Sequence, residues 1–240
     1  MSCVGKTGRR HDGVFAFLHV PVQSGSDRVL SKDLMNREYT REQFCEVADK
    51  LLERVPHLTL ATDVICGFPY ETEADHDGTL ALIARYKFPV LNISQFYPRR
   101  GTPAAKMPRV PTHIVKQRTR EASTLFASYR THDHLLGTEQ LVLVSEIASD
   151  GASLVAHTKG YVQVLLPHEP AHMGCSLLVR ITATHKFYLM ADVLQVLTHP
   201  SSPQAAAAVV ENAKLARANK AKGKKAAEAG KAAVEEEATG

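Results

Sequence analysis

The residues with the clearest chemical character in this chain are positively charged and lie in one long stretch. No aspartate or glutamate occurs between Asp77 and Glu121. Nine lysines and arginines occupy the same interval: Arg85, Lys87, Arg99, Arg100, Lys106, Arg109, Lys116, Arg118 and Arg120. Clustered positive charge suits a ligand that carries phosphate or carboxylate groups. A solvated basic helix face explains the same charges equally well, so the pattern alone leaves both interpretations open.

The four cysteines are too far apart to bind a metal as a local motif. Cys3, Cys45, Cys66 and Cys175 form neither a CxxC nor a CxxxCxxC pattern, and these are the spacings that local metal sites use. In a chain of 240 residues, reduced thiols fit better than a disulfide framework. The 12 histidines are scattered. The sequence therefore predicts no metal ligands.

Three apolar runs indicate the strands that would position a site in the first half of the chain. They are "VFAFLHV" at 14–20, "LTLATDVI" at 58–65 and "VLNISQF" at 90–96. Strands that alternate with helices predict a parallel sheet with right-handed crossovers. Ligands of such sheets bind at the carboxyl ends of the strands. We therefore expect the loops "PVQSGSD", "CGFPYET" and "YPRRGTPAAK" to lie on the same side.

Capping signals indicate where the helices begin. Thr40 with Gln43 three residues later forms a capping-box pattern. Thr72 is a second N-cap residue. A third helix is expected to begin near Pro111, since proline is tolerated in a first turn, and to run to about Asp133.

The second half of the chain has a different pattern. Five short β-rich runs separated by small turns predict a small antiparallel barrel over residues 137–198. Residues 201–240 are rich in alanine, lysine and glutamate and contain too few large apolar side chains for a core, so we expect disorder there. The α/β part is expected to span 11–134, after a separate N-terminal segment at 1–10.

Several ordered motifs together resemble the radical-SAM tRNA methylthiotransferases. They are "FAFLHVPVQSGSDRVL", "MNREYT", "LATDVICGFPYET", "YKFPVLNISQFYPRRGTPAAKM" and "VKQRT". The resemblance is greatest to the type that acts on threonylcarbamoyladenosine, and the final β-rich region resembles the TRAM domain of those enzymes. Long motifs in the correct order are far more specific than one short pattern.

The resemblance implies a fold and a chemistry. The fold is α/β: the C-terminal half of a (β/α)6 radical-SAM barrel, as three βα units, followed by the TRAM β-barrel. Members of the family add a 2-methylthio group to the modified adenosine next to the anticodon, using S-adenosylmethionine and [4Fe-4S] clusters. Cluster iron needs thiolate ligands, and this chain lacks the family's CxxxCxxC loop. We expect the isolated chain to be inactive.

The resemblance also assigns candidate cofactor-binding residues. On the S-adenosylmethionine side of the barrel it places Gln23, Ser24, Ile65, Gly67 and Arg99. Ser24 could equally cap a helix. Where the family has glycine this chain has Tyr70, and Glu71 is interpreted as an acid at a helix N-terminus.

Transfer RNA is the partner that the resemblance implies, and two regions are candidates for binding its anticodon stem-loop. The basic region contributes Arg100, Lys106, Lys116, Arg118 and Arg120, and the TRAM region contributes His157, Lys159, Tyr161 and Arg180. Residues 128–200 contain four Lys and Arg against six Asp and Glu, which shifts the anion-binding role to the basic stretch 99–120. Tyr161 could instead belong to the barrel core.

Two interpretations of the whole chain remain open. In one it is a fragment of a methylthiotransferase, or a short form that a separate N-terminal chain completes. In the other it is a non-enzymatic RNA-binding protein that uses TRAM and the basic stretch. No apolar run reaches the length of a membrane span, so we expect a cytoplasmic chain without a membrane partner.

Overall fold

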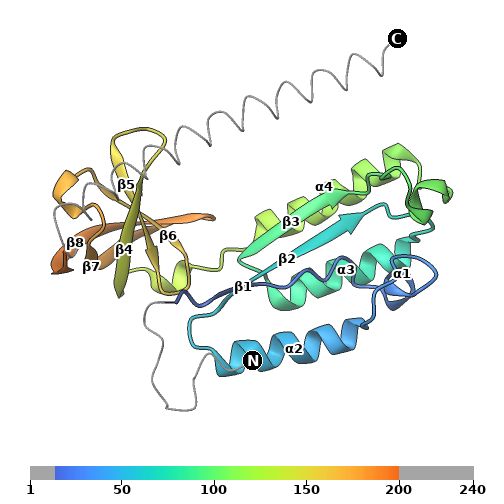
Figure 1. The fold of residues 1–240 in the computed structure, drawn as a ribbon, viewed down its shortest axis with the longest axis horizontal. Helices are drawn as coiled ribbons and strands as arrows, with labels where there is room; N and C mark the ends of the chain where they lie inside the picture. Colours follow the sequence, from blue (N-terminus) through green and yellow to red (C-terminus); the bar gives the residue numbers. More distant parts are fainter. Residues whose placement is uncertain (1–13, 200–240) are drawn as a thin grey trace, which may run out of the picture. The chain divides into compact units, whose positions relative to one another are not determined.

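The computed structural model describes residues 14–199, which divide into two compact units (Figure 1). The first unit contains the α/β part up to His134, together with the short segments Lys159–Tyr161 and His185–Phe187. The second contains the rest of the β-rich region. Cys3, the segment 1–10 and the tail 201–240 lie outside the described residues.

A three-stranded parallel sheet forms the centre of the first unit, as the sequence predicts. Strands β1 (Phe17–His19), β2 (Thr59–Cys66) and β3 (Val90–Gln95) pair in the order β1-β2-β3, so β2 lies between its two neighbours (Figure 1). The central strand is almost entirely buried, which explains its nearly continuous run of apolar residues and threonines.

Helices follow each strand and begin where the capping signals place them. Helix α2 (Arg41–Arg54) and helix α3 (Glu73–Tyr86) both open with complete capping boxes, at Thr40 with Gln43 and at Thr72 with Asp75. Each box satisfies two backbone groups that a helix start otherwise leaves without a partner. Helix α1 (Asp27–Leu30) is a single turn capped by Ser26.

Helix α4 (Thr112–Ser128) is shorter than the sequence predicts. Tyr129 leaves the helix with extended backbone angles, and its hydroxyl donates to the carbonyl oxygen of Phe88 at 3.1 Å. Because this buried ring belongs to the core that Phe44, Val64 and Ile83 also form, the chain turns inward instead of continuing the helix. A short 3-10 turn (η1, Pro103–Lys106) precedes α4, and another (η2, Asp133–Leu135) follows it.

The β-rich region forms a closed five-stranded barrel, in agreement with the predicted architecture. Its strands are β4 (Glu139–Ile147), β5 (Ser153–Thr158), β6 (Gln163–Pro167), β7 (Ser176–Thr184) and β8 (Tyr188–Thr198), and a 3-10 turn (η3, Pro170–His172) joins β6 to β7. The order around the barrel is β4-β5-β6-β8-β7. Four neighbouring pairs are antiparallel, as the sequence predicts, and one pair, β6 with β8, is parallel.

Apolar side chains from all five strands fill the barrel, among them Val142, Leu154, Val164, Leu177 and Leu189. No helix within residues 14–199 is long and apolar enough to cross a membrane.

Candidate functional site

The loops that leave the three parallel strands contain an unusual number of left-handed residues. Gln23, Gly67, Tyr70 and Gly101 all have positive φ angles, of 69°, 77°, 63° and 83°. The backbone of Gln23 extends the sheet, because its N–H donates to the carbonyl oxygen of Asp63 at 2.8 Å and its own carbonyl oxygen accepts from the N–H of Ile65 at 2.9 Å. These loops therefore start from fixed positions at the carboxyl edge of the sheet.

Two of the five candidate cofactor residues, Ser24 and Gly67, have structural reasons for their residue type. Ser24 is fully buried, and its hydroxyl oxygen accepts from the N–H of Ser26 at 3.2 Å. A Cβ added at Gly67 would lie 2.4 Å from a methyl of Val115. The expectation that Ser24 faces a ligand is therefore not supported, whereas Gln23 and Ile65 are partly exposed and Arg99 is exposed.

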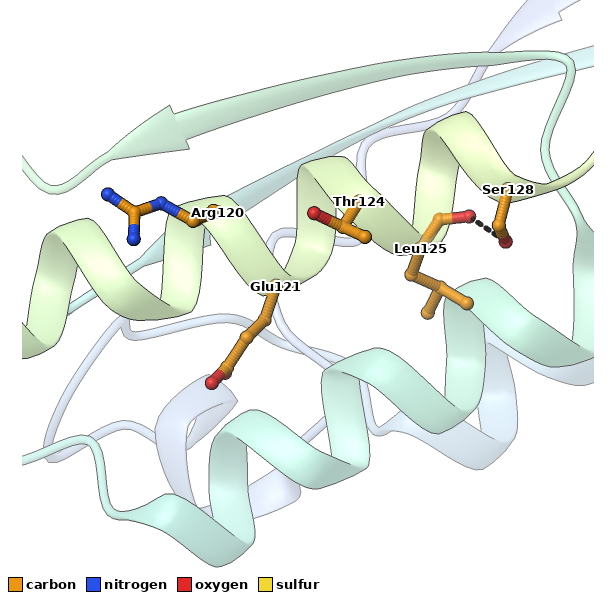
Figure 2. A pocket seen from close by; sticks show the side chains of 5 residues that line it. All are labelled: Arg120, Glu121, Thr124, Leu125 and Ser128. Atoms are coloured by element: carbon orange, nitrogen blue, oxygen red, sulfur yellow. Dashed lines mark hydrogen bonds between the residues drawn. The ribbon is translucent and has the colours of Figure 1, made fainter.

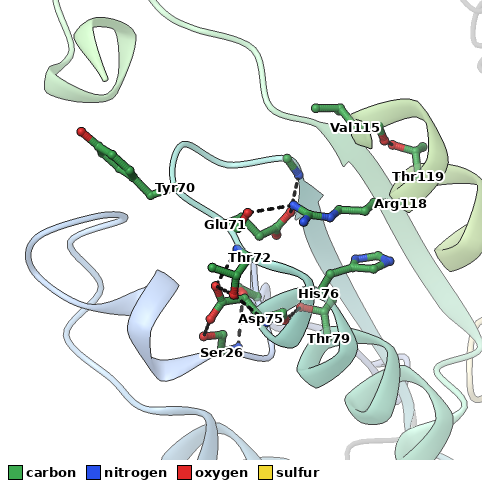
Figure 3. A network of polar contacts seen from close by, with 12 residues as sticks. Ser26, Tyr70, Glu71, Thr72, Asp75, His76, Thr79, Val115, Arg118 and Thr119 are labelled. Atoms are coloured by element: carbon green, nitrogen blue, oxygen red, sulfur yellow. Dashed lines mark hydrogen bonds and ion pairs between the residues drawn. The ribbon is translucent and has the colours of Figure 1, made fainter. Parts of the chain in front are cut away.

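Glu71 and Arg118 form a buried ion pair behind the loop that follows β2 (Figure 3). The guanidinium of Arg118 donates to the Glu71 carboxylate at 2.8 Å and to the Glu71 carbonyl oxygen at 3.0 Å. The same carboxylate accepts from the N–H of Gly67 at 2.7 Å. Burial raises the pKa of Glu71, while the Gly67 N–H and Arg118 offset part of that effect.

This geometry corrects the prediction for Arg118. Its side chain is 9% exposed and committed to Glu71, so it is a structural residue and does not present its charge to RNA. Glu71 is likewise more than an acid near a helix N-terminus, because its carboxylate holds the loop closed on Gly67.

A second polar network ties the loop after β1 to the start of α3 (Figure 3). The Asp75 carboxylate accepts from the hydroxyls of Ser26 and Thr72 at 2.6 Å each, and it pairs with Arg28. Burial opposes ionisation of Asp75, but the hydrogen bonds from Arg28, Ser26 and Thr72 hold its pKa well below its usual range. The sequence indicated Thr72 as an N-cap residue but neither the capping role of Asp75 nor its distant partner Arg28.

The other positive residues of the basic stretch are at the surface. Arg99, Arg100, Lys106, Arg109, Lys116 and Arg120 are exposed. None of the six forms an ion pair within residues 14–199. Their charges are therefore available to an anionic ligand.

A shallow surface hollow lies along α4, lined by Arg120, Glu121, Thr124, Leu125 and Ser128 (Figure 2). Its lining contains no residue of the strand-end loops. The hollow is thus separate from the edge where the candidate cofactor residues lie.

The TRAM-region candidates differ in their surroundings. His157 is buried beside Ser145, whose hydroxyl lies 3.2 Å from its Nδ1, and burial lowers the pKa of this histidine. The expectation of a surface contact at His157 was therefore wrong. Arg180 is exposed and bonds Glu139 on the neighbouring strand at 2.9 Å.

Lys159 and Tyr161 belong to a segment that groups with the first unit. Lys159 is partly exposed. Tyr161 is 43% exposed, so it is not a fully buried core residue, and its ring meets Phe15 edge-on at 4.8 Å.

The described residues do not fit an iron–sulfur cluster. Cys45, Cys66 and Cys175 are buried free thiols, and burial raises the pKa of Cys66 to about 11, which disfavours the thiolate. Within residues 14–199 no three His, Cys, Asp or Glu side chains are grouped to hold a metal.

One metal-like pattern had escaped the sequence interpretation. His168, Glu169 and His172 reproduce the HExxH spacing of zinc proteases. That motif requires an α-helix, whereas Pro170–His172 here is a 3-10 turn between β6 and β7. The pattern therefore lacks its structural context.

Comparisons with known proteins agree with the fold. Residues 134–194 match the TRAM domain. The chain is 51% identical over 186 residues to threonylcarbamoyladenosine tRNA methylthiotransferase of Danio rerio, which covers 78% of this chain and 34% of that protein. Identity to the Homo sapiens protein of the same name is also 51%, over 179 residues, covering 75% of this chain and 31% of the human protein.

A bacterial relative of a second type also matches. The tRNA-2-methylthio-N(6)-dimethylallyladenosine synthase of Moorella thermoacetica is 37% identical over 189 residues, covering 77% of this chain and 42% of that protein. The chain spans about a third of the length of the animal relatives. By these similarities it belongs to the tRNA methylthiotransferase family.

Proposed function

We propose that this chain is the tRNA-holding part of a methylthiotransferase that acts on threonylcarbamoyladenosine next to the anticodon. The observation that carries the proposal is the set of exposed, unpaired positive side chains on the loop after β3 and on α4. Phosphate contacts from such residues supply essentially all of the affinity of non-specific nucleic-acid binding and a large share of that of specific binding. The match of residues 134–194 to the TRAM domain and the names of the relatives support tRNA as the ligand.

We propose that the chain contributes to the S-adenosylmethionine site but does not hold the iron–sulfur cluster. In such enzymes the cluster supplies the electron that cleaves S-adenosylmethionine. The described residues here do not fit a cluster. We propose that Gln23, Ile65 and Arg99 border the S-adenosylmethionine site, and that a separate N-terminal chain holds the cluster.

Reconstitution tests the cofactor proposal. The full chain is incubated with iron, sulfide, S-adenosylmethionine and a reductant, and 5′-deoxyadenosine is measured. We expect none above the protein-free control. Formation of 5′-deoxyadenosine with cluster absorbance would overturn the proposal that the chain is inactive alone.

Charge reversal tests the RNA-holding proposal. The variant Arg99→Glu with Arg100→Glu is titrated against a labelled anticodon stem-loop beside Lys50→Glu with Arg54→Glu, an equal reversal on the exposed part of α2. We expect the first pair to weaken binding at least tenfold, about 1.4 kcal/mol, and the second to change it little. If both double variants weaken binding equally, the RNA is held by the overall charge of the chain and not by a site at Arg99 and Arg100.

A non-enzymatic RNA-binding role is the second candidate, and the TRAM match of residues 134–194 together with the exposed positive side chains favours it. Co-expression with the part of the Danio rerio relative that this chain does not cover separates the two functions. Mass spectrometry of tRNA nucleosides then reports 2-methylthio product. Product only with both pieces supports the enzyme, whereas RNA binding without product in any combination supports the binding protein.

A further inference from the structure

Tyr70 occupies a backbone conformation that side chains normally avoid. The N–H of Glu71 donates to the carbonyl oxygen of Phe68 at 3.0 Å, which closes a four-residue turn with Pro69 and Tyr70 at its centre. Tyr70 has a φ of 63°. Proline followed by a left-handed residue is the arrangement of a type II turn, where glycine or asparagine is favoured because a Cβ is strained.

The neighbours of Tyr70 are buried, whereas its own side chain is exposed. Phe68, Pro69 and Glu71 are buried, and Arg28 donates to the Tyr70 carbonyl oxygen at 2.6 Å. The Tyr70 side chain itself is 51% exposed, and Figure 3 shows its ring pointing away from the polar network. Packing therefore does not compensate for the strain, and strain of this kind at a ligand-facing edge suggests a role for the side chain.

A second exposed aromatic ring leaves the sheet at the same edge. Tyr97 follows β3 and is 76% exposed. Contacts join the loop after β2 to the loop after β3. The rings of Phe68 and Phe96 meet edge-on at 5.0 Å, and the Phe96 N–H donates to the carbonyl oxygen of Cys66 at 2.9 Å. Arg99 and Arg100 come next along the chain.

Exposed aromatic rings beside unpaired arginines are the combination with which proteins hold unstacked nucleobases. We propose that Tyr70 stacks on an unpaired base of a single-stranded RNA loop, with Tyr97 as a second platform. Arg99 and Arg100 then contact the adjacent phosphates. The inference rests on the proposed function. It adds that stacking on Tyr70 would distinguish an RNA loop from a duplex, because the bases inside a duplex are already stacked on one another.

Substitutions at Tyr70 separate stacking from stability. In the full chain, Tyr70→Asn and Tyr70→Gly are expected to raise the Tm by about 2–4 °C, because both residues accept the left-handed conformation. The same variants should weaken binding of an anticodon stem-loop about 5- to 150-fold, the range for one lost base stack. Tyr70→Phe keeps the ring and should bind like the wild type.

A matched control is available at the opposite end of the sheet. His57 precedes β2, is exposed, and also has a left-handed φ of 61°. His57→Asn should raise the Tm without changing RNA affinity. A stem without a loop should bind wild type and Tyr70→Asn equally.

The outcomes distinguish this inference from the proposed function. If Tyr70→Asn and Tyr70→Gly bind the stem-loop like the wild type while Arg99→Glu with Arg100→Glu weakens binding, the stacking role is overturned and the RNA-holding role stands. If the wild-type chain does not bind the stem-loop at all, both are overturned. Quenching of 2-aminopurine in the loop by wild type and by Tyr70→Phe, but not by Tyr70→Asn, supports stacking directly.

Discussion

Arg118 shows how a charge within a basic stretch can belong to the core. In the sequence it is one of nine positive residues without an intervening acid. In the structure it pairs with Glu71, which lies 47 positions earlier. A local pattern of charge cannot reveal a partner at that separation.

The buried pair should dominate the effect of substitution at this position. Arg118→Met leaves the Glu71 carboxylate buried without its cation, and we expect a loss of about 3–5 kcal/mol in the free energy of unfolding. Lys116→Met, at an exposed position of the same helix, should change it by less than about 0.5 kcal/mol. Urea unfolding measures both.

A double substitution completes this test. Arg118→Met combined with Glu71→Gln should cost less than the sum of the single changes, because no charge then remains buried. Additive losses would contradict the pairing.

Asp75 should determine part of the acid sensitivity of the fold. Its pKa is lower in the folded chain than in the unfolded chain, so the stability it contributes is present above the unfolded pKa of about 3.9 and is lost as the pH falls below it. Asp75→Asn should lower the Tm at pH 7 and flatten its decline toward pH 3. Asp33→Asn, at an exposed position, should keep the wild-type pH profile.

At the scale of elements, the turn after β2 and helix α4 fit together through Gly67 and Val115. The sequence identified the strand, the turn and the helix start that surround Gly67. It could not show that α4 packs against the turn, because that contact joins segments almost 50 residues apart. The structure gives glycine at this position a packing reason, which is its close approach to α4.

Gly67→Ala should destabilise the chain for two separable reasons. The left-handed φ of 77° strains any Cβ, and that Cβ would also collide with Val115. We expect a loss of about 2–4 kcal/mol in the free energy of unfolding, from the sum of a strain cost and an overpacking cost. Gly101→Ala is the matched control, because its φ is 83° and a Cβ there meets nothing within 4 Å.

The two costs at Gly67 separate in a second variant. On a Val115→Ala background, which has its own cost from the buried valine, Gly67→Ala should add only the strain cost, because the collision is removed. A loss at Gly67→Ala no larger than at Gly101→Ala would contradict the packing role.

The sequence predicted the strands and helices better than it predicted which strands of the barrel pair with one another. Apolar runs and N-cap residues are local signals, and they placed the three parallel strands and the starts of α2 and α3 correctly. The parallel pairing of β6 with β8 is a property of the closed barrel. No local signal in either strand specifies it.

At the scale of the whole molecule, one sheet has unpaired edge strands and the other does not. The barrel is closed and has no free edge. Within residues 14–199, β1 and β3 each pair with β2 only. Unpaired strand edges are places where another strand adds, so β1 and β3 each leave an edge open to a further strand.

The salt dependence of RNA binding tests the central claim most directly. The affinity of the full chain for an anticodon stem-loop is measured across a series of KCl concentrations, for wild type and for Arg99→Glu with Arg100→Glu. Each single-stranded phosphate contact contributes about 0.7 to the slope of log K against log [KCl]. We predict that the double variant has a slope smaller by about 1.4. An unchanged slope, or wild-type binding independent of salt, would contradict the claim that this edge of the sheet holds tRNA.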